Sequence, residues 1–148
     1  GCEYKIGEID NSRENNVCAG IVGIAIDSNF SDCVATVNMK GHNAGSLDMR
    51  AGGIVAHLMG TSSISNCSYF GDITPRKLRD PGAPEYFGCI AGLAQDETIS
   101  ITDCRCGGTI NGNVISENNL STYIIHYSPN GGPASDATVT GCSYWNGE

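Results

Sequence analysis

Cysteine recurs at nearly constant spacing along the whole chain, and this spacing constrains the fold more than any other feature. Five of the eight cysteines are separated by 31, 34, 37 and 38 residues, and these are Cys2, Cys33, Cys67, Cys104 and Cys142. Each of these anchor cysteines follows Asp, Asn or Gly. In the last four copies Ser or Thr stands two positions before the cysteine, and an apolar residue stands three before it. Self-similarity at this period is typical of stacked repeat architectures.

Two further features recur in register with the anchor cysteines. A Gly-rich apolar block precedes each of three anchors, at residues 19–23, 52–56 and 88–92, and residues 123–125 form a degenerate fourth copy. Ile21, Ile54 and Ile90 in these blocks precede the next anchor by 12, 13 and 14 residues. Six residues after an anchor come Met39, Ile73 and Ile110. Agreement among three independent features establishes the repeat.

The repeat unit predicts short strands joined by tight corners. Apolar runs bounded by Gly, Asn, Asp and Ser are typical of strands, and the chain has 20 glycines. Asp, Asn and Gly tolerate left-handed backbone, so the residue before each anchor is a natural corner. A bend there lets the cysteine and the apolar residue three before it both face inward. We expect two clear strands per unit and a variable third segment at residues 10–17, 40–50, 74–86 and 111–122.

We therefore predict an all-β fold, a parallel β-helix (β-solenoid) of about four coils with an internal cysteine ladder. Equivalent residues of neighbouring coils would stack about 4.8 Å apart. An isoleucine ladder (Ile21, Ile54, Ile90) and the Met39, Ile73, Ile110 ladder would flank the cysteines. Gly23, Ala56 and Gly92 would hold a tight corner. Helical repeats and a sandwich of hairpins are the competing folds. The Gly-rich segments have low helix propensity, which disfavours helical repeats. A sandwich would not require a cysteine at the same step of every unit.

The central repeats resemble the Gly-rich GLUG-type repeats of bacterial cell-surface proteins. The resemblance rests on Ala-Gly-Gly-Ile-Val-Ala at residues 51–56 with Ile-Ser-Asn-Cys-Ser-Tyr-Phe-Gly-Asp-Ile at 64–73. It also rests on Gly-Cys-Ile-Ala-Gly at residues 88–92, Ile-Thr-Asp-Cys at 101–104 and Gly-Thr-Ile at 108–110. The resemblance implies a right-handed β-helix in an exported protein with an adhesin-like or scaffold role. The first and last copies depart from the pattern.

Stacked cysteines favour free thiols over a disulfide framework. Side chains stacked in a parallel sheet point the same way, whereas disulfide geometry is specific, and free cysteine packs as a small hydrophobe. Cys18, Cys89 and Cys106 lie off the ladder and are the candidates for any disulfide. Cys104 and Cys106 lack the C-x2-C spacing of structural zinc sites. We expect no metal and no cofactor.

Composition excludes several partner classes. The net charge of −8 disfavours nucleic acid, because phosphate binding needs clustered Lys and Arg. No stretch is apolar for long enough to insert into a membrane. We expect residues 1–148 to form a single domain, a fragment of a longer repeat protein that is secreted or displayed on a bacterial cell surface and adjoins flanking domains.

Catalytic residues are not evident. A glycosidase needs two carboxylates at a set separation, and no acid pair among Asp27, Asp32, Asp72, Asp96, Glu97 and Asp103 breaks the repeat pattern. Asp32 and Asp103 are best explained as corner residues. A cysteine nucleophile would need His42, His57 or His126 beside a reactive thiol, but ladder thiols should be buried and inert. We therefore expect a protein that is not an enzyme.

Two departures from the repeat are candidate binding surfaces. One is the Pro-rich segment 74–84, which carries Arg76, Lys77 and Arg79 and could equally be a solvated loop. The other is aromatic, because Tyr69-Phe70 and Tyr144-Trp145 occupy the same repeat step. Outward rings could stack on sugars or on a protein partner, and inward rings would instead seal the solenoid ends.

The function we expect is a non-catalytic surface module, adhesin-like, that binds carbohydrate or protein, with glycans or host and cell-surface proteins as partners. A polysaccharide-degrading enzyme, or its accessory domain, is the alternative from another class. A purely structural spacer is the third possibility. A cluster of carboxylates on one exposed sheet would favour the enzyme, and a ligand on a glycan array would exclude the spacer.

Overall fold

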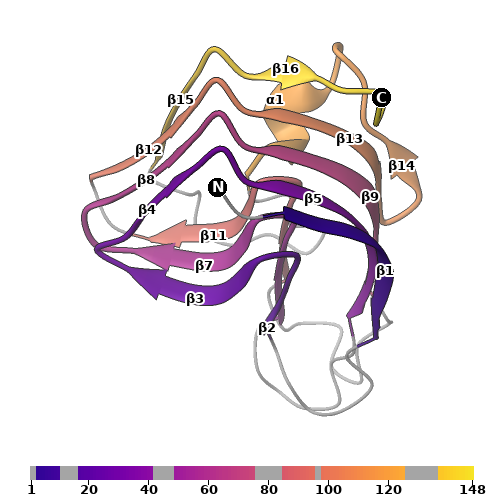
Figure 1. The fold of residues 1–148 in the computed structure, drawn as a ribbon, viewed down its shortest axis with the longest axis horizontal. Coiled ribbons are helices and arrows are strands. Elements are labelled where there is room, and N and C mark those ends of the chain that lie inside the picture. Colours follow the sequence, from indigo (N-terminus) through magenta and orange to yellow (C-terminus); the bar gives the residue numbers. More distant parts are fainter. Residues whose placement is uncertain (1–2, 11–16, 42–48, 76–84, 96–97, 126–136) are drawn as a thin grey trace.

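The computed structural model describes residues 3–10, 17–41, 49–75, 85–95, 98–125 and 137–148. Within these residues the chain is almost entirely β-strand and winds into stacked coils (Figure 1). The one described helix, α1 (Leu120–Tyr123), has four residues. The all-β prediction is confirmed.

Each complete coil contains four short strands, one from each of four parallel sheets. The first coil contains β2 (Val17–Ala19), β3 (Val22–Ile26), β4 (Asn29–Ser31) and β5 (Val34–Gly41). The second contains β6 (Met49–Gly52), β7 (Val55–Met59), β8 (Ser62–Ser65) and β9 (Ser68–Pro75). The third contains β10 (Glu85–Gly88), β11 (Ala91–Gln95), β12 (Ile99–Thr102) and β13 (Arg105–Ile110). Partial coils add β1 (Glu3–Asp10) at one end and β15 (Ala137–Thr140) and β16 (Ser143–Tyr144) at the other.

The four sheets are defined by which strands stack. Sheet A has the order β1-β5-β9-β13, with β16 also pairing with β13, and the hairpin strand β14 (Asn113–Val114) pairs antiparallel to β13. Sheet B has the order β10-β6-β2, sheet C β11-β7-β3, and sheet D β15-β12-β8-β4. Stacked parallel strands in four sheets confirm the predicted β-solenoid of about four coils. Each unit contains four strands and not the two expected, because one predicted strand divides at the predicted corner before the anchor cysteine and the other divides within the Gly-rich block.

The residue before each anchor cysteine forms the predicted corner. Asp32, Asn66, Asp103 and Gly141 have φ values of 55°, 51°, 53° and 67°, all left-handed. In most residues the Cβ clashes with the backbone at a left-handed φ, whereas Asp, Asn and Gly adopt this conformation more readily. The corner turns the chain from sheet D into sheet A, so that Ile64 and Cys67, although three residues apart, are both fully buried.

The predicted ladders are present inside the coils. Met39 pairs with Ile73 and Ile73 with Ile110, and all three side chains are buried. The amide of Ile21 donates to the carbonyl of Ile54, Ile54 donates to Ile90, and Ile90 donates to Ile124. Because equivalent residues stack at every coil, each coil buries the apolar face of its neighbour.

The tight corner expected at Gly23, Ala56 and Gly92 lies elsewhere. All three residues are inside strands of sheet C, and the chain turns at Gly20, Gly53 and their neighbours, just before those strands. A Cβ on Gly53 would lie 2.0 Å from the carbonyl oxygen of Cys89 in the next coil, whereas a Cβ on Gly23 would meet only Val17 Cγ1, at 3.3 Å. A Cβ on Gly92 would lie 2.6 Å from the carbonyl oxygen of Ala56, so the expected close approach between coils is present at Gly92, as it is at Gly20 and Gly53, but not at Gly23.

Candidate functional site

The outer face of sheet A carries an aromatic cluster made of Phe70, Arg105 and Trp145. Residues of a strand alternate between its two faces, and Tyr69 and Cys106 point into the core, where both are fully buried. Their neighbours Phe70 and Gly107 pair with each other and face outward. Trp145 continues this row in the last coil, where its amide donates to the carbonyl of Cys106 at 3.0 Å.

Phe70 and Trp145 meet although a whole coil separates them. Their ring centroids lie 6.2 Å apart at an interplanar angle of 74°, an edge-to-face contact. Gly107 lies between them and has no side chain to intervene. A Cβ there would lie 1.9 Å from the carbonyl oxygen of Trp145 and 3.1 Å from Phe70 Cδ2. The glycine of the middle coil is therefore what allows the two rings to touch.

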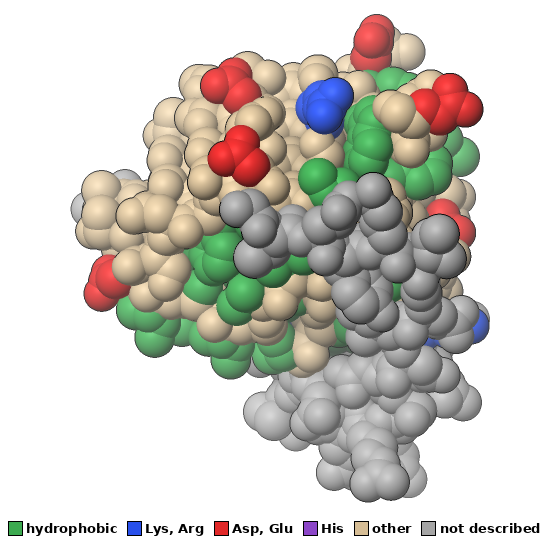
Figure 2. Space-filling model, viewed as in Figure 1, with side chains coloured by type: hydrophobic (Ala, Val, Ile, Leu, Met, Phe, Trp, Pro, Cys, Tyr) green, Lys and Arg blue, Asp and Glu red, His purple; other side chains and the backbone are tan. Residues whose placement is uncertain are grey.

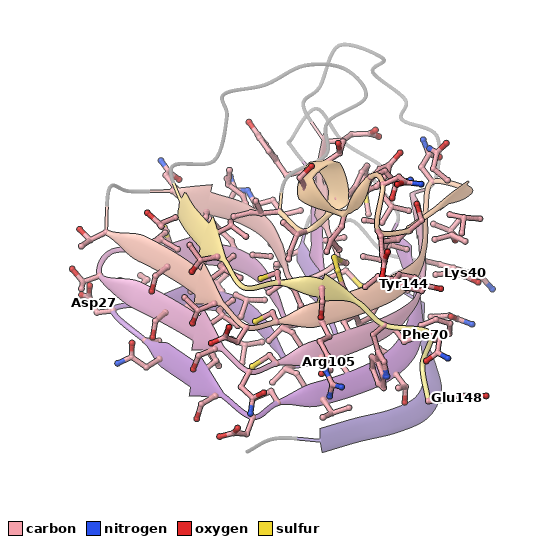
Figure 3. The ribbon with its side chains drawn as sticks, turned by 90° about the horizontal axis from the view of Figure 1, so that it is seen from above. Asp27, Lys40, Phe70, Arg105, Tyr144 and Glu148 are labelled. Atoms are coloured by element: carbon pink, nitrogen blue, oxygen red, sulfur yellow. A yellow bond between two sulfur atoms is a disulfide. The ribbon has the colours of Figure 1, made fainter. Side chains whose placement is uncertain are left out.

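A cation completes the cluster. The guanidinium carbon of Arg105 lies 5.6 Å from the centre of the Trp145 ring, within the range of a cation–π interaction. Arg105 is exposed, and Figure 3 shows its side chain beside Phe70 on the same side of sheet A. The indole Nε1–H of Trp145 donates to the carbonyl oxygen of Glu148 at 2.7 Å, which fixes the ring.

A row of polar side chains runs beside the aromatic cluster on the same face. Thr109 Oγ1 donates to Asp72 Oδ1 at 2.7 Å, and the amide of Asp72 donates to Asn38 Oδ1 at 2.9 Å. These three residues occupy the step two positions beyond Thr36, Phe70 and Gly107 in successive strands. Aromatic surface and hydrogen-bonding groups therefore lie in parallel columns.

The binding residues expected from the sequence divide into three groups. Phe70 and Trp145 lie together on the outer face, and Tyr144 is 38% exposed at the last coil. Tyr69 is fully buried, with its hydroxyl donating to the carbonyl oxygen of Val37 at 2.9 Å, so it is unavailable to a ligand. Desolvation by burial raises the pKa of Tyr69 well above its ordinary value. Arg76, Lys77 and Arg79 lie outside the described residues.

Sequence reasoning missed Arg105. A signal was present, because Arg105 directly follows the anchor Cys104, and the anchor faces inward. Strand alternation then turns Arg105 outward, two residues before the step of Phe70 and Trp145.

Four acidic residues named as possible catalysts have structural partners instead. Asp27 Oδ1 accepts the amide of Thr61 at 2.9 Å, and Asp32 accepts a hydrogen bond from the Asn66 side-chain amide. Asp72 accepts the hydroxyl of Thr109. Asp103 forms a left-handed corner with φ of 53°, where its amide donates to the carbonyl oxygen of Thr140 at 3.0 Å. Asp96 and Glu97 lie outside the described residues.

The one described histidine belongs to a polar network away from the thiols. His57 Nδ1 lies 2.7 Å from Arg50 Nη1, and its Nε2 lies 3.1 Å from Gln95 Oε1. Arg50 can only donate, so Nδ1 accepts and Nε2–H donates to Gln95. Both ring nitrogens are therefore engaged, one by Arg50 and the other by Gln95. His42 and His126 lie outside the described residues.

The cysteine ladder consists of free thiols, as predicted, and one disulfide lies off it. Cys33, Cys67, Cys104 and Cys142 stand at successive corners as thiols outside any disulfide, and the amide of Cys33 donates to Cys67 Sγ at 3.4 Å. Cys89 and Cys106, two of the three candidates, form a disulfide with a Cα–Cα distance of 6.0 Å. Cys18 is a free, buried thiol, and Cys2 lies outside the described residues.

Hydrogen bonding between stacked thiols lowers the pKa of some ladder cysteines and raises the pKa of another. Hydrogen bonding to Cys104 lowers the pKa of Cys142 to about 7 and that of Cys67 to about 7, while the same contacts raise the pKa of Cys104. Cys67 is fully buried, whereas Cys142 is half-buried at the last coil. Among the ladder thiols that the structure describes, Cys142 is therefore the one that reagents in solvent can reach.

The described residues bring together no group of three or more His, Cys, Asp or Glu that could hold a metal ion. Nor does the described part of the chain contain a helix long and apolar enough to cross a membrane.

Comparison with known families identifies one coil. Residues 48–74 match the GLUG motif. The matched GLUG segment contains β6, β7, β8 and all but the last residue of β9, which is one turn of the solenoid with one strand in each sheet. The resemblance noted in the sequence is thereby confirmed for the second coil, and the first and third coils stack on the GLUG segment in register. No curated protein and no solved structure matches the chain.

Proposed function

We propose that this chain is a non-catalytic binding module of an exported bacterial protein, and that it binds carbohydrate through the outer face of sheet A. The observation that carries the proposal is the contact between Phe70 and Trp145 over Gly107, flanked by Arg105. Trp, Tyr and Arg dominate the energetics of protein binding surfaces.

The arrangement suits a sugar ligand for two reasons. A half-exposed indole presents a flat apolar surface beside polar atoms, and a sugar ring likewise combines an apolar face with hydroxyl groups around its rim. The column of Asn38, Asp72 and Thr109 supplies carboxylate, amide and hydroxyl groups next to the rings. Such groups could pair with sugar hydroxyls lying alongside the stacked ring.

The non-catalytic part of the proposal rests on the roles of the described acids. Asp27, Asp32 and Asp103 lie at corners, and Asp72 is hydrogen-bonded within the polar column. A glycosidase needs one carboxyl that can give up a proton and a second that faces it across the scissile bond. The corner and hydrogen-bonding roles of these four aspartates support the non-catalytic proposal, because each carboxylate has a structural role in the coil.

Export is supported by the Cys89–Cys106 disulfide. Disulfides persist in oxidising compartments and are rare in the cytosol. Together with the GLUG segment, this favours a secreted or surface-displayed protein.

A glycan array probed with the folded chain tests the proposal, followed by calorimetry on the sugars retained. We expect at least one retained glycan, and Trp145→Ala should weaken its binding roughly tenfold or more. Arg105→Ala should weaken binding while leaving the coil intact, since its side chain is exposed. Asn29→Ala, an exposed change on sheet D, is the matched control and should bind as the wild type does.

A structural spacer predicts a different outcome. If the folded wild-type chain retains no glycan, or if Trp145→Ala and Asn29→Ala bind equally well, then the outer face of sheet A is not a carbohydrate site.

A further inference from the structure

The guanidinium of Arg105 contacts Trp145 through its flat face and is open to solvent at its edge. Its central carbon lies 5.6 Å from the centre of the Trp145 ring. A guanidinium that stacks on an aromatic ring keeps its five N–H donors in its own plane, where the ring does not cover them. The side chain is exposed, and among the described residues none of these donors forms a hydrogen bond or an ion pair. A positioned set of charged donors therefore lies beside the indole.

The acidic residues around Arg105 do not neutralise its charge. Asp103 lies two residues before it, at a left-handed corner with φ of 53°. Asp72, on the neighbouring strand β9, accepts the hydroxyl of Thr109 at 2.7 Å. Within the described residues, no ion pair joins either carboxylate to Arg105. The cation is therefore open to an anion that comes from outside this part of the chain.

A hydroxyl group lies next to this cation in the stack. Ser143 pairs with Arg105 in the register of sheet A, and its side chain is exposed. No hydrogen bond of the Ser143 hydroxyl is present within the described residues, and a hydroxyl can donate to an anionic oxygen. In Figure 2 a basic side chain lies beside hydrophobic side chains over the upper part of the coil stack. Charge, hydroxyl and aromatic surface therefore occur together on one lateral face.

The geometry of a guanidinium selects the kind of anion. Its planar fork matches two oxygens of one carboxylate, sulfate or phosphate group, and such charge-assisted bonds are roughly twice as strong as neutral ones. A polymer of phosphates needs clustered Lys and Arg, whereas Arg105 is the one described cation beside the Phe70–Trp145 pair. One cation with two rings and a polar column instead suits a ring that carries a single acidic group among hydroxyls.

Resting on the carbohydrate site proposed above, we infer that the ligand is an acidic saccharide, whose carboxylate or sulfate ester binds Arg105. The anionic oxygens accept hydrogen bonds from the edge of the guanidinium and from the Ser143 hydroxyl. The sugar ring lies against the exposed surface of the Phe70–Trp145 pair, and its neutral hydroxyls face the column that contains Asp72 and Thr109. Because Trp145 already holds the guanidinium, little side-chain freedom is lost when the anion binds.

A glycan array that carries each carboxylated or sulfated oligosaccharide beside its neutral parent tests this inference with the wild-type chain alone. We expect retention of acidic glycans and weaker retention of their neutral parents. Carboxylated and sulfated members separate the two sources of the anion. Calorimetry then compares one retained glycan with a neutralised form, the methyl ester of a carboxylate or the desulfated parent of a sulfate ester. Neutralisation should raise the dissociation constant roughly tenfold or more.

Arg105→Gln removes the charge and should weaken binding of the acidic glycan roughly tenfold or more, while binding of its neutral parent changes little. Lys40→Gln is the matched control, because it makes the same change of charge at an exposed position of the same sheet. Lys40 pairs with Thr74, six residues beyond the Ser68 that pairs with Arg105, so this variant should bind as the wild type does. Circular dichroism checks that both variants keep the β-fold.

The outcomes separate this inference from the proposal on which it rests. Neutral parents retained as strongly as acidic glycans would overturn the acidic ligand and leave a carbohydrate site in place. Equal losses in Arg105→Gln and Lys40→Gln would also overturn it, because the effect would then come from overall charge and not from the position beside Trp145. If the wild-type chain retains no glycan at all, both the acidic ligand and the carbohydrate site are wrong.

Discussion

The ring of Tyr69 fills the space that a side chain on Gly53 would otherwise occupy on the far side of the core. A Cβ on Gly53 would lie 2.3 Å from Tyr69 Cγ. The first and third coils place different pairs at the same two steps, Gly20 opposite Ala35 and Cys89 bonded to Cys106. Each coil therefore closes the distance between sheets B and A in its own way, with a large ring, a small pair or a covalent bond.

Gly53→Ala should destabilise the fold sharply. The added Cβ meets both the Tyr69 ring and the carbonyl oxygen of Cys89, and a packed core accommodates extra atoms only by straining its neighbours. We expect the free energy of unfolding, measured by urea denaturation, to fall by about 3 kcal/mol. Gly23→Ala is the control and should cost much less, since its nearest contact is a valine methyl at 3.3 Å. Equal losses in the two variants would contradict the close approach at Gly53.

Asp103→Ala should cost about 1–2 kcal/mol of unfolding free energy, because alanine opposes the left-handed φ of 53° at this corner. Asp103→Gly should cost less than Asp103→Ala, since Gly141 occupies the same step of the next coil with the same backbone. Chemical denaturation of both variants provides the comparison. If glycine proves as costly as alanine, backbone conformation is not what selects the corner residue.

Reduction of the Cys89–Cys106 disulfide should lower the free energy of unfolding by about 3 kcal/mol, because the bond closes a loop with a sequence separation of 17 residues. Alkylation in denaturant without reductant, read by mass spectrometry, should label Cys18, Cys33, Cys67, Cys104 and Cys142 and leave Cys89 and Cys106 unlabelled. The Cys89→Ala, Cys106→Ala double variant is the control, and its unfolding should not respond to reductant. Labelling of Cys89 without reductant would rule out the bond.

Glu85→Gln should stabilise the protein near neutral pH. Glu85 is only 6% exposed, and desolvation raises its pKa above the ordinary value of 4.5. The folded state therefore holds this proton to higher pH than the unfolded state does, and stability falls as pH rises through the folded pKa. The variant should exceed wild type at about pH 7 and match it at about pH 3, where both states are protonated.

Melting curves of wild type and Glu85→Gln across this pH range check the sign. Glu117→Gln, an exposed change, should show no such pH-dependent difference. A stability gap between Glu85→Gln and wild type that grows on acidification would refute the buried-carboxyl explanation.

Most of the fold could be predicted from the repeat, because the residues that specify strands and corners lie close together in the sequence. Asp or Asn before Cys67 and Cys104 predicts a left-handed corner. The nearly constant spacing of the anchor cysteines places equivalent residues of neighbouring coils one above another. The isoleucine and Met39 ladders followed from the same stacking. The bend within the Gly-rich block was placed three residues too late, at Gly23 and Ala56 in place of Gly20 and Gly53, because the contact with the next coil selects which residue of the block turns.

Part of the aromatic site could also be predicted from the repeat. Phe70 and Trp145 shared a repeat step that the sequence displays, and strand alternation could also have revealed Arg105. That Tyr69 points inward, while Tyr144 at the same step is partly exposed, depends on whether another coil lies above it.

The amino-acid sequence alone determined the coil, its corners and the residues that stack along it, since these depend on residue type and on contacts between neighbouring repeats. The tertiary structure decided which residues face each other across the core, namely Tyr69 with Gly53 and Cys89 with Cys106. Such relationships depend on the distance between sheets, which the period of a repeat does not predict.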